Sequence, residues 1–321
     1  MSDLKNWKQR VSVAARRIGP YIVHTPIISS QRMSEETGHQ VWLKCEQLQP
    51  TGAFKIRGAA NALLARNSEE RRKGTITYST GNHGLAVAYM AQQLGIPAII
   101  CISSRVPANK VEVLKATGAR VVIEGNSQDD AKEVAEDIAR KDRLIMIEPF
   151  DDLDVIAGQG TVGLEILEQL PEATTVLAPL SGGGLLSGLS VFIKANRPDI
   201  RVIGVSMNQG AIMYESIRAG QPVQMPEVPT LADSLQGGIG INNRFTFSMV
   251  REYVDDIILV KEEEIGRAMA LLGREGLIVE GAGAVAVAAL SHHLRLRGSI
   301  VAILTGRNIS LSTFCGIIKD Y

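Results

Sequence analysis

The sequence predicts an α/β fold of two open, mostly parallel, twisted sheets with flanking helices. The first observation is a series of apolar runs of about five residues, rich in Val, Ile and Leu, as the buried strands of parallel sheets are. The second is that amphipathic segments separate these runs along the whole chain, which is the pattern of alternating strands and helices. The predicted strands are residues 75–78, 98–102, 120–124, 144–147, 176–180, 202–205 and 300–304.

Helical patterns lie between these strands. Residues 129–140 carry charges on one face and place Val134 and Ile138 on the other, as an amphipathic helix does. A polar stretch with prolines, residues 221–230, is predicted to be an excursion loop rather than a domain boundary. The other predicted helices are residues 85–94, 110–117, 163–170, 185–195 and 262–274.

The order of the elements indicates one unit set inside another. Residues 74–143 run strand, helix, strand, helix, strand, helix, which suffices for a small open sheet. We therefore expect a small domain at residues 74–143, inserted in a large domain formed by residues 1–73 and 144–321.

Composition excludes several classes of protein. The chain has 321 residues, 45% of them hydrophobic, and its 34 basic residues balance 34 acidic ones, which argues against a nucleic-acid or anionic-membrane partner. Cys45, Cys101 and Cys315 lie far apart and form no C-x-x-C pair, as in reduced cytoplasmic proteins without disulfides or zinc sites. The N-terminus is polar, unlike a signal peptide, and no apolar stretch has the length of a membrane span.

The segment Ser181-Gly182-Gly183-Gly184 joins a predicted strand to a predicted helix. Glycines at such a turn let backbone N–H groups converge on an anion, and the helix N-terminus adds positive potential. A phosphate group is the usual ligand of such a turn. The alternative is a tight turn that needs glycine for its backbone geometry alone.

Lys55 lies in the largely apolar, glycine-flanked segment TGAFKIRG, residues 51–58. Lysines in such surroundings can have a depressed pKa and act as Schiff-base amines. Taken alone, the segment favours the ordinary alternative, a lysine that extends along a helix surface to water.

Two further polar segments directly follow predicted strands. STGNHG, residues 79–84, offers hydroxyls, an amide and backbone N–H groups that can hold a carboxylate, although a capped helix start uses the same residue types. His83 in this segment fits a structural hydrogen-bonding role better than that of a catalytic base. TGRN, residues 305–308, follows another strand. Because ligands of open α/β sheets bind beyond the carboxyl ends of the strands, we expect these segments to meet.

Together these segments resemble the fold-type II pyridoxal phosphate (PLP) family of threonine and serine dehydratases and serine racemases. The resemblance covers nearly the whole chain and implies a tryptophan-synthase-β-like fold, a PLP cofactor and a homodimer. Residues 232–240 (ADSLQGGIG) and 279–284 (VEGAGA) are most similar to the branch of hydroxyectoine-utilisation dehydratases. The motifs that occur in the family's order and spacing are QPTGAFKIRGA (49–59), STGNHG (79–84), AGQGT (157–161), SGGGLLSG (181–188) and TGRN (305–308).

The resemblance also implies a role for each site residue. Lys55 would hold the cofactor as a Schiff base and move the Cα proton of the substrate. The rest of the cofactor site would be Phe54, Asn82 at the phenolic oxygen, Gly182, Gly183 and Gly184 at the phosphate, and Thr305 at the pyridine nitrogen. The substrate carboxylate would bind at Ser79, Thr80, Gly81, Asn82 and His83.

Several positions depart from the family's pattern. Ser181 stands where a fourth glycine is common. Thr80 stands where racemases carry a serine, a second acid–base group on the opposite cofactor face, so Thr80 is a further catalytic candidate. Ser206 and Ile212 stand where acidic ligands of a divalent cation are expected, so we predict no metal site. Arg307 replaces a small residue, and either pairs with a surface acid or binds the distal end of the substrate.

The predicted function is PLP-dependent α,β-elimination of a β-hydroxy amino acid such as threonine, serine or a hydroxyectoine-derived amino acid. Its products are a 2-oxo acid, or the enamine or imine that precedes it, and ammonia. An amino-acid racemase or a β-replacement synthase of the same fold is the alternative. A dinucleotide dehydrogenase is a weaker rival, because Gly158-x-Gly160-x-x-Gly163 has the spacing but the preceding apolar run ends about ten residues too early. An intact Lys55 argues against a non-catalytic binding protein.

Overall fold

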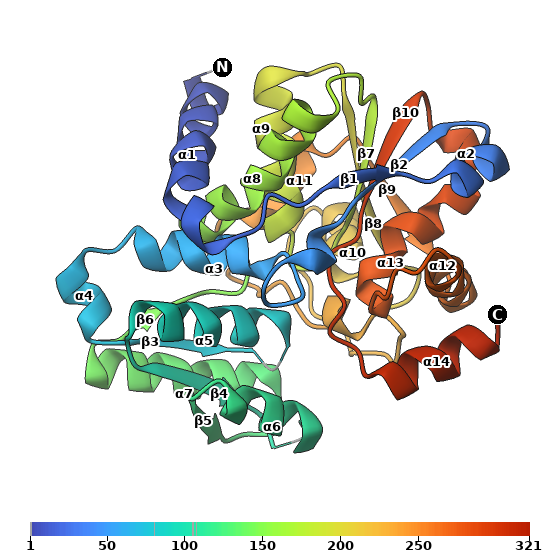
Figure 1. The fold of residues 1–321 in the computed structure, drawn as a ribbon. Coiled ribbons are helices and arrows are strands. Elements are labelled where there is room, and N and C mark those ends of the chain that lie inside the picture. Colours follow the sequence, from blue (N-terminus) through green and yellow to red (C-terminus); the bar gives the residue numbers. More distant parts are fainter. Residues whose placement is uncertain (1, 80, 105, 107) are drawn as a thin grey trace.

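Two mainly parallel sheets flanked by helices form the chain, which confirms the predicted fold class (Figure 1). The computed structural model describes residues 2–79, 81–104, 106 and 108–321. The large sheet has the order β1-β2-β10-β7-β8-β9, and only β1 and β2 pair antiparallel. Its strands are β1 (Ile27–Ser29), β2 (Gln40–Lys44), β7 (Thr175–Pro179), β8 (Arg201–Met207), β9 (Asp256–Val260) and β10 (Ser299–Ile303).

The small sheet has the order β5-β4-β3-β6 and is parallel throughout. The predicted boundary put residues 144–321 in the large domain, whereas β6 pairs with β3, so the small sheet extends past residue 143. The division into two domains stays a proposal. The strands of the small sheet are β3 (Thr75–Tyr78), β4 (Ala98–Ile102), β5 (Arg120–Ile123) and β6 (Ile145–Met146).

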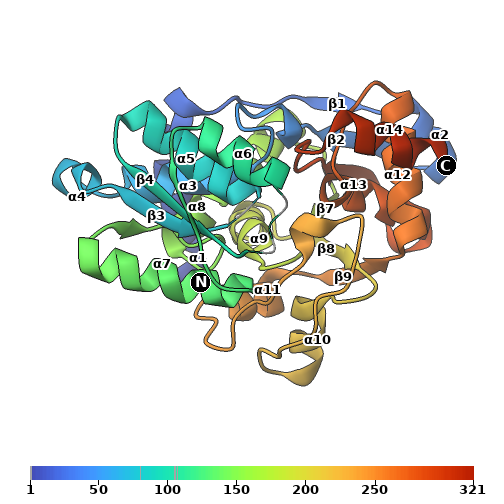
Figure 2. The same cartoon turned by 90° about the horizontal axis from the view of Figure 1, so that it is seen from below.

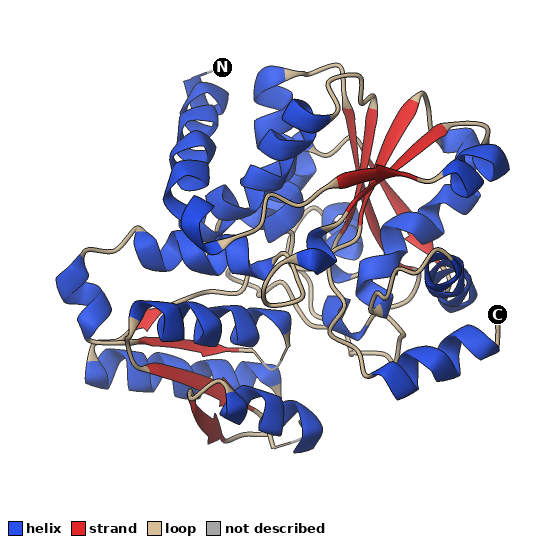
Figure 3. Cartoon of the chain, in the orientation of Figure 1, coloured by secondary structure: helices blue, strands red, loops and turns tan. Residues whose placement is uncertain are grey.

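Helices cover both faces of both sheets, as the colouring by secondary structure shows (Figure 3). In the N-terminal half they are α1 (Ser2–Ile18), α2 (Gln31–Thr37), α3 (Lys55–Leu64), α4 (Ser68–Arg72), α5 (Asn82–Leu94), α6 (Ala108–Ala116), α7 (Gln128–Asp142) and α8 (Leu153–Gln169). In the C-terminal half they are α9 (Gly184–Asn196), α10 (Ile212–Ala219), α11 (Thr246–Tyr253), α12 (Glu262–Arg274), α13 (Gly281–Ala288) and α14 (Leu311–Lys319). Short 3-10 turns lie at Gly19–Tyr21, Glu46–Leu48, Asp233–Leu235 and Ala289–Arg295.

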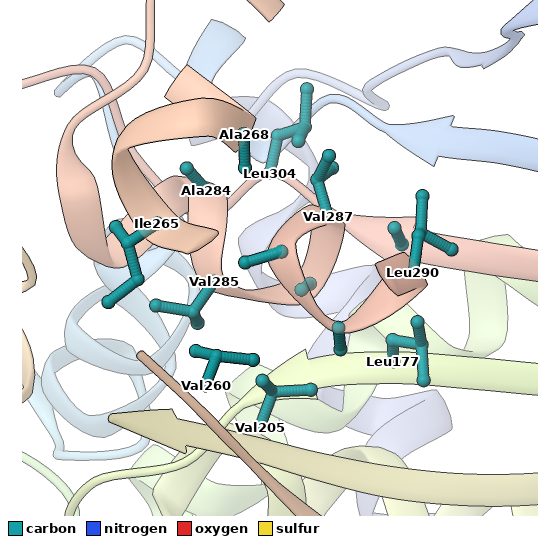
Figure 4. Close-up of a cluster of buried hydrophobic side chains, with 14 of the residues drawn as sticks. Leu177, Val205, Val260, Ile265, Ala268, Ala284, Val285, Val287, Leu290 and Leu304 are labelled. Carbon is teal, nitrogen blue, oxygen red and sulfur yellow. The ribbon is translucent and has the colours of Figure 1, made fainter. Parts of the chain in front are cut away.

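The large sheet lies between two hydrophobic clusters. On one face α8 and α9 pack against β7 and β8 through Ile166, Leu186 and Leu189. On the other face α12 and α13 cover the sheet, and Figure 4 shows Val285 of α13 beside Val205 and Val260 of the strands. Burial on both faces explains why these strands are continuous apolar runs.

The small sheet is also covered on both faces, by α7 on one and by α5 and α6 on the other. Figure 2 shows the small sheet and its helices beside the large one. The helix predicted at residues 163–170 was too short, because α8 already begins at Leu153. In the described part of the chain, no helix combines the length and apolar character needed to cross a membrane.

Candidate active site

A cavity of about 170 Å³ lies at the carboxyl ends of β3, β7 and β10. The segments that follow these three strands line it, together with the start of α3 and residues 233–238. The cavity brings together ten of the residues predicted from the sequence. They are Phe54, Lys55, Ser79, Gly81, Asn82, His83, Gly182, Gly183, Gly184 and Thr305.

Lys55 is the first residue of α3 and is partly buried in this cavity. Its Nζ donates a hydrogen bond to the carbonyl oxygen of Pro149 at 2.8 Å. Burial disfavours the charged ammonium and lowers the pKa of Lys55 to about 8. A substantial fraction of the amine is therefore neutral near physiological pH, and the neutral amine is the nucleophilic form.

The helix that carries Lys55 is anchored by a buried cluster of charges. Arg57 Nε donates to Glu46 at 2.7 Å and Arg57 Nη1 donates to Glu165 at 2.7 Å, while Lys44 Nζ donates to Glu165 at 2.6 Å. Burial alone would raise the pKa of Glu46, but the adjacent Arg57 holds it below its ordinary value. The two cations and two carboxylates balance, and they tie α3 to β2 and α8. This network fixes the start of α3, from which Lys55 projects.

The glycine turn after β7 has the geometry of an anion site. Gly183 adopts a φ of +85°, a left-handed conformation that favours glycine, and a Cβ there would lie 2.9 Å from Met213 Cε. No side chain caps the N-terminus of α9, which begins at Gly184. The first N–H groups of this helix therefore have no side-chain acceptor, and its dipole favours a negative charge at this point.

The segment after β3 leads into α5, whose N-terminus also lacks a side-chain cap. His83 Nε2 lies 3.1 Å from the carbonyl oxygen of Ile147, and since a carbonyl only accepts, Nε2 carries the proton. His83 Nδ1 is buried with no partner among the described residues. Burial, followed by the nearby charge of Lys55, lowers the pKa of His83 to about 3, so the imidazole is neutral. This supports the structural role predicted for His83.

Thr305 is buried and points its hydroxyl towards the carbonyl oxygen of Ala282, at 3.4 Å. Its own carbonyl accepts from the N–H of Phe54 at 3.0 Å, and Ala53 forms a bridge with Gly306. These backbone bonds hold the segment after β10 against the start of α3. Thr305 and Lys55 therefore keep a fixed relative position.

Not every predicted residue joins the cavity. Arg307 is exposed and does not line it, so the structure does not bring this arginine together with the other site residues. Thr80 lies outside the described residues. Ser206 is buried at the end of β8 and Ile212 begins α10, and across the described positions no three His, Cys, Asp or Glu are grouped to hold a metal ion.

The sequence analysis did not single out three residues at the site, Glu280, Asn308 and Phe150. Glu280 is buried, lines the cavity and accepts a hydrogen bond from Asn82, which also contacts Asn308. Phe150 packs against the glycine turn, where a Cβ at Gly184 would lie 3.0 Å from it. Glu280 and Asn308 stood within quoted motifs, VEGAGA and TGRN, but nothing local distinguished them.

A second, more open cleft of about 720 Å³ adjoins the cavity and shares Phe150 and Gly238 with it. Its walls come from the segment after β6, from the first half of α7 and from the loop before α11. The cleft is mixed in character, with Lys132 and Arg244 beside Glu136. A molecule in the small cavity could extend into this space.

The site residues fit a phosphorylated pyridine aldehyde. An amine of lowered pKa can hold the aldehyde, and an uncapped helix N-terminus can hold a phosphate dianion. Thr305 offers a neutral hydroxyl, and Asn82 offers amide hydrogens. The cavity thus combines the functional groups that pyridoxal phosphate requires.

Comparison with known proteins agrees with this chemistry. Residues 18–306 match the sequence profile of the family described as pyridoxal-phosphate dependent enzyme. The chain is 47% identical to a putative threonine dehydratase of Sinorhizobium fredii, over 99% of this chain and 97% of that protein. It is 43% identical to L-threonine ammonia-lyase of Thermotoga maritima, over 95% and 76%. The structure of maize serine racemase superposes with a TM-score of 0.91 at 35% identity, covering 97% of this chain and 96% of that one.

Proposed function

This chain belongs to the family of pyridoxal-phosphate-dependent enzymes, and we propose that it eliminates water from a β-hydroxy amino acid. The resulting enamine, as its imine, then takes up one water and gives a 2-oxo acid and ammonia. The observation that carries the proposal is the shared cavity of Lys55, with its lowered pKa, and the uncapped glycine turn of residues 182–184. The names of the bacterial relatives, threonine dehydratase and threonine ammonia-lyase, support elimination as the reaction.

On this proposal each part of the cavity has one task. Lys55 would bind the cofactor's aldehyde carbon, and residues 182–184 would bind its phosphate through backbone N–H groups. Asn82 would donate to the phenolic oxygen, Thr305 would face the ring nitrogen, and Phe54 would pack beside the ring. The bound cofactor supplies an electron sink that stabilises negative charge at the substrate Cα.

The substrate carboxylate would bind at the start of α5. Ser79, Gly81, Asn82 and His83 line the cavity there, and the uncapped helix N-terminus supplies positive potential. His83 is neutral, so this potential is the attraction that the segment offers to an anion. Thr80 belongs to the same segment of the sequence and is proposed as a further contact.

Lys55 would then move the protons of the reaction. With a pKa of about 8 its amine can take the Cα proton and return a proton to the departing hydroxyl. Thr305 would offer the ring nitrogen a neutral hydroxyl instead of a carboxylate, which would leave that nitrogen less protonated. Charge at Cα would then be less delocalised, and expulsion of the β-hydroxyl would compete better with other outcomes.

Racemisation is the second candidate, favoured by the superposition on maize serine racemase. It needs a proton donor on the cofactor face opposite Lys55. Thr80 is the candidate for that role, and its extra methyl group restricts its χ1 angle compared with serine. We therefore propose elimination as the main reaction, with racemisation or β-replacement as the minor outcome.

The substrate range can extend beyond serine and threonine. The cleft of about 720 Å³ that adjoins the cavity leaves room for a longer side chain. This room, together with the similarity of residues 232–240 and 279–284 to hydroxyectoine-utilisation dehydratases, supports a hydroxyectoine-derived amino acid as one substrate. A screen of β-hydroxy amino acids of increasing length tests this extension.

A product assay tests the proposal. The PLP-loaded protein is incubated with L-threonine, L-serine and the longer amino acids, and 2-oxo acid, ammonia and D-amino acid are measured together. We expect oxo acid and ammonia in equal amounts and in excess of D-amino acid. Borohydride reduction and peptide mapping should label Lys55, and Lys55→Ala should abolish turnover, whereas the exposed Lys141→Ala should not. D-amino acid outpacing oxo acid would instead establish a racemase.

A further inference from the structure

A chain of side-chain hydrogen bonds connects Glu280, Asn82 and Asn308, and Asn82 lines the cavity. Asn82 Nδ2 donates to Glu280 Oε1 at 2.6 Å. Asn308 Nδ2 donates both to Asn82 Oδ1, at 2.5 Å, and to the carbonyl oxygen of Thr51, at 2.9 Å. Three segments far apart in the sequence thus meet at one amide.

The chemistry of the two ends fixes which way the Asn82 amide faces. The oxygen and nitrogen of an amide can exchange places, so its orientation depends on its partners. The carbonyl of Thr51 only accepts, which requires Asn308 to present its NH₂ group there, and the same group faces Asn82 Oδ1. At the other end a carboxylate oxygen of Glu280 is the acceptor, and it pairs with Asn82 Nδ2. Both ends therefore select the same orientation.

The consequence concerns the second hydrogen on Asn82 Nδ2. One hydrogen is used by Glu280, and the other remains available on a residue that lines the cavity. We infer that Glu280 and Asn308 are positioning residues that hold the Asn82 amide so that it donates its second N–H to the phenolic oxygen of the cofactor. This rests on the proposed function in one respect, the contact of Asn82 with that oxygen.

Burial restricts Glu280, and hydrogen bonds restrict Asn308. Glu280 is 4% exposed and its backbone N–H donates to the carbonyl oxygen of Gly306 at 3.0 Å, while any Cβ at Gly306 would collide with the Glu280 carboxylate. Gly52 adopts a φ of +73°, and a Cβ there would collide with the amide of Asn308. The buried Glu280 side chain has little room to move, and the exposed Asn308 amide is held by its hydrogen bonds to Thr51 and Asn82, so the donor is oriented before the cofactor binds.

A purely structural role for these residues makes a different prediction. If Glu280 and Asn308 only stabilised the fold, their replacement would weaken every ligand of the cavity alike. If they orient one hydrogen-bond donor, the loss is confined to ligands that carry the phenolic oxygen. The two readings are separated by a PLP analogue in which hydrogen replaces the phenolic hydroxyl.

The deciding variant is Asn308→Asp, with Asn308→Ala as its match. Both remove the donor to Thr51, but the aspartate also places an acceptor opposite Asn82 Oδ1 and so opposes the native orientation. The dissociation constants of PLP and of the analogue are measured by equilibrium dialysis, and the visible absorption band of bound PLP is recorded. We expect Asn308→Asp to weaken PLP by about 10- to 100-fold, the scale of one charge-assisted hydrogen bond. The analogue should change by no more than about twofold.

Further variants complete the test. Asn308→Ala should lose less PLP affinity than Asn308→Asp, because Glu280 still selects Nδ2. Glu280→Gln can accept through its amide oxygen and should stay within about twofold of the native protein. Asn82→Ala defines the full loss, and the exposed, remote Glu172→Ala is the control.

Equal effects of aspartate and alanine at position 308, or equal losses for PLP and the analogue, would overturn the inference. If Asn308→Asp does not fold, the double variant Glu280→Ala/Asn308→Ala gives the test instead. The fold-loss of PLP affinity in the double variant should exceed the product of the fold-losses in Glu280→Ala and Asn308→Ala, because each residue alone can still orient the Asn82 amide. A double-variant loss equal to that product would contradict the positioning role. These are binding measurements, so a protein that binds PLP but forms no 2-oxo acid refutes the proposed reaction and leaves this inference intact.

Discussion

At the scale of single residues, Lys55 sets the pH range in which the cofactor can be captured. Its amine lies in a cavity where burial lowers the pKa to about 8 from the ordinary lysine value of 10.5. Below pH 8 the ammonium predominates and has no lone pair, and above pH 8 the neutral amine predominates and can attack an aldehyde.

We therefore expect the rate of PLP uptake by the cofactor-free protein to rise with pH and to level off just above pH 8. Stopped-flow measurement of the visible absorption band between pH 6 and 11 records this rate. Nα-acetyl-lysine in solution is the reference, since its rate should keep rising to about pH 10.4. An inflection of the protein's rate above pH 10 would show that burial does not lower this pKa.

The sequence identified most single residues of the candidate site, because they stand in motifs that follow strands. It missed Glu280 and Asn308 as individuals, because their partner Asn82 lies 198 and 226 positions away along the chain. Nor could it place Arg307, which stands two residues after Thr305 and yet lies outside the cavity. Sequence proximity within a loop does not determine which side chains face inward.

At the scale of elements, glycine explains why the helix predicted at residues 163–170 is too short. Gly158, Gly160 and Gly163 have the spacing of a nucleotide-binding turn, and only Gly163 lies in the predicted helix. All three lie within α8, where a Cβ at Gly158 would collide with the backbone of α3 and a Cβ at Gly160 would lie 2.8 Å from the carbonyl oxygen of Gly188. These glycines allow close helix packing, which a local rule for helix breakers does not consider.

The matching prediction concerns Gly188 of α9. A Cβ there would collide with the carbonyl oxygen of Ile156, so Gly188→Ala should force α8 and α9 apart. We expect the free energy of unfolding to fall by about 1–3 kcal/mol, the cost of overpacking a core, as measured by urea denaturation.

Gly316→Ala is the control for this measurement. Gly316 lies inside α14 with no atom near its Cβ position, so alanine should raise the free energy of unfolding by about 0.5–1 kcal/mol through helix propensity. The same substitution, glycine to alanine, is thus expected to lower the free energy of unfolding at position 188 and to raise it at position 316. A stabilising Gly188→Ala would show that the contact between α8 and α9 is not close.

Other elements escaped prediction because polar residues interrupt their apolar pattern. β2 ends at Lys44, which is fully buried and paired with Glu165 of α8. On the sequence such a lysine indicates a solvent-exposed turn, since its partner is 121 positions away. Arg57 is a similar case on α3, with Glu46 as one partner. Buried ion pairs depend on tertiary contacts, which periodicity does not encode.

At the scale of the whole molecule, the cavity lies where two sheets meet, and each contributes part of it. The large sheet provides the segments after β7 and β10, and the small sheet provides the segment after β3. Binding of one ligand therefore requires both sheets to be in place. The large sheet also has the larger core, since the two hydrophobic clusters on its faces contain more buried residues than the two clusters around the small sheet.

This asymmetry predicts two levels of local opening in native-state hydrogen exchange. In the cofactor-free protein, amides of β3 and β4 should exchange through an opening of lower free energy than amides of β7, β8 and β10, because fewer buried contacts oppose it. The amides of Ile145 and Ile147 decide where the boundary lies, since they donate to the carbonyl oxygens of Gly74 and Ile76 in the small sheet. We expect both to exchange with β3 and β4.

Added PLP should protect both sets of amides, because opening either unit breaks the cavity and releases the ligand. Hydrogen exchange followed by NMR or by mass spectrometry with and without PLP measures this. The amides of Gln224, Met225 and Glu227, exposed residues outside helices and strands, serve as a fast-exchanging reference. If Ile145 and Ile147 exchange with β7, the small domain ends at residue 143, as the sequence predicts. If all strands share one opening free energy, the chain unfolds as a single unit and the two-domain proposal fails.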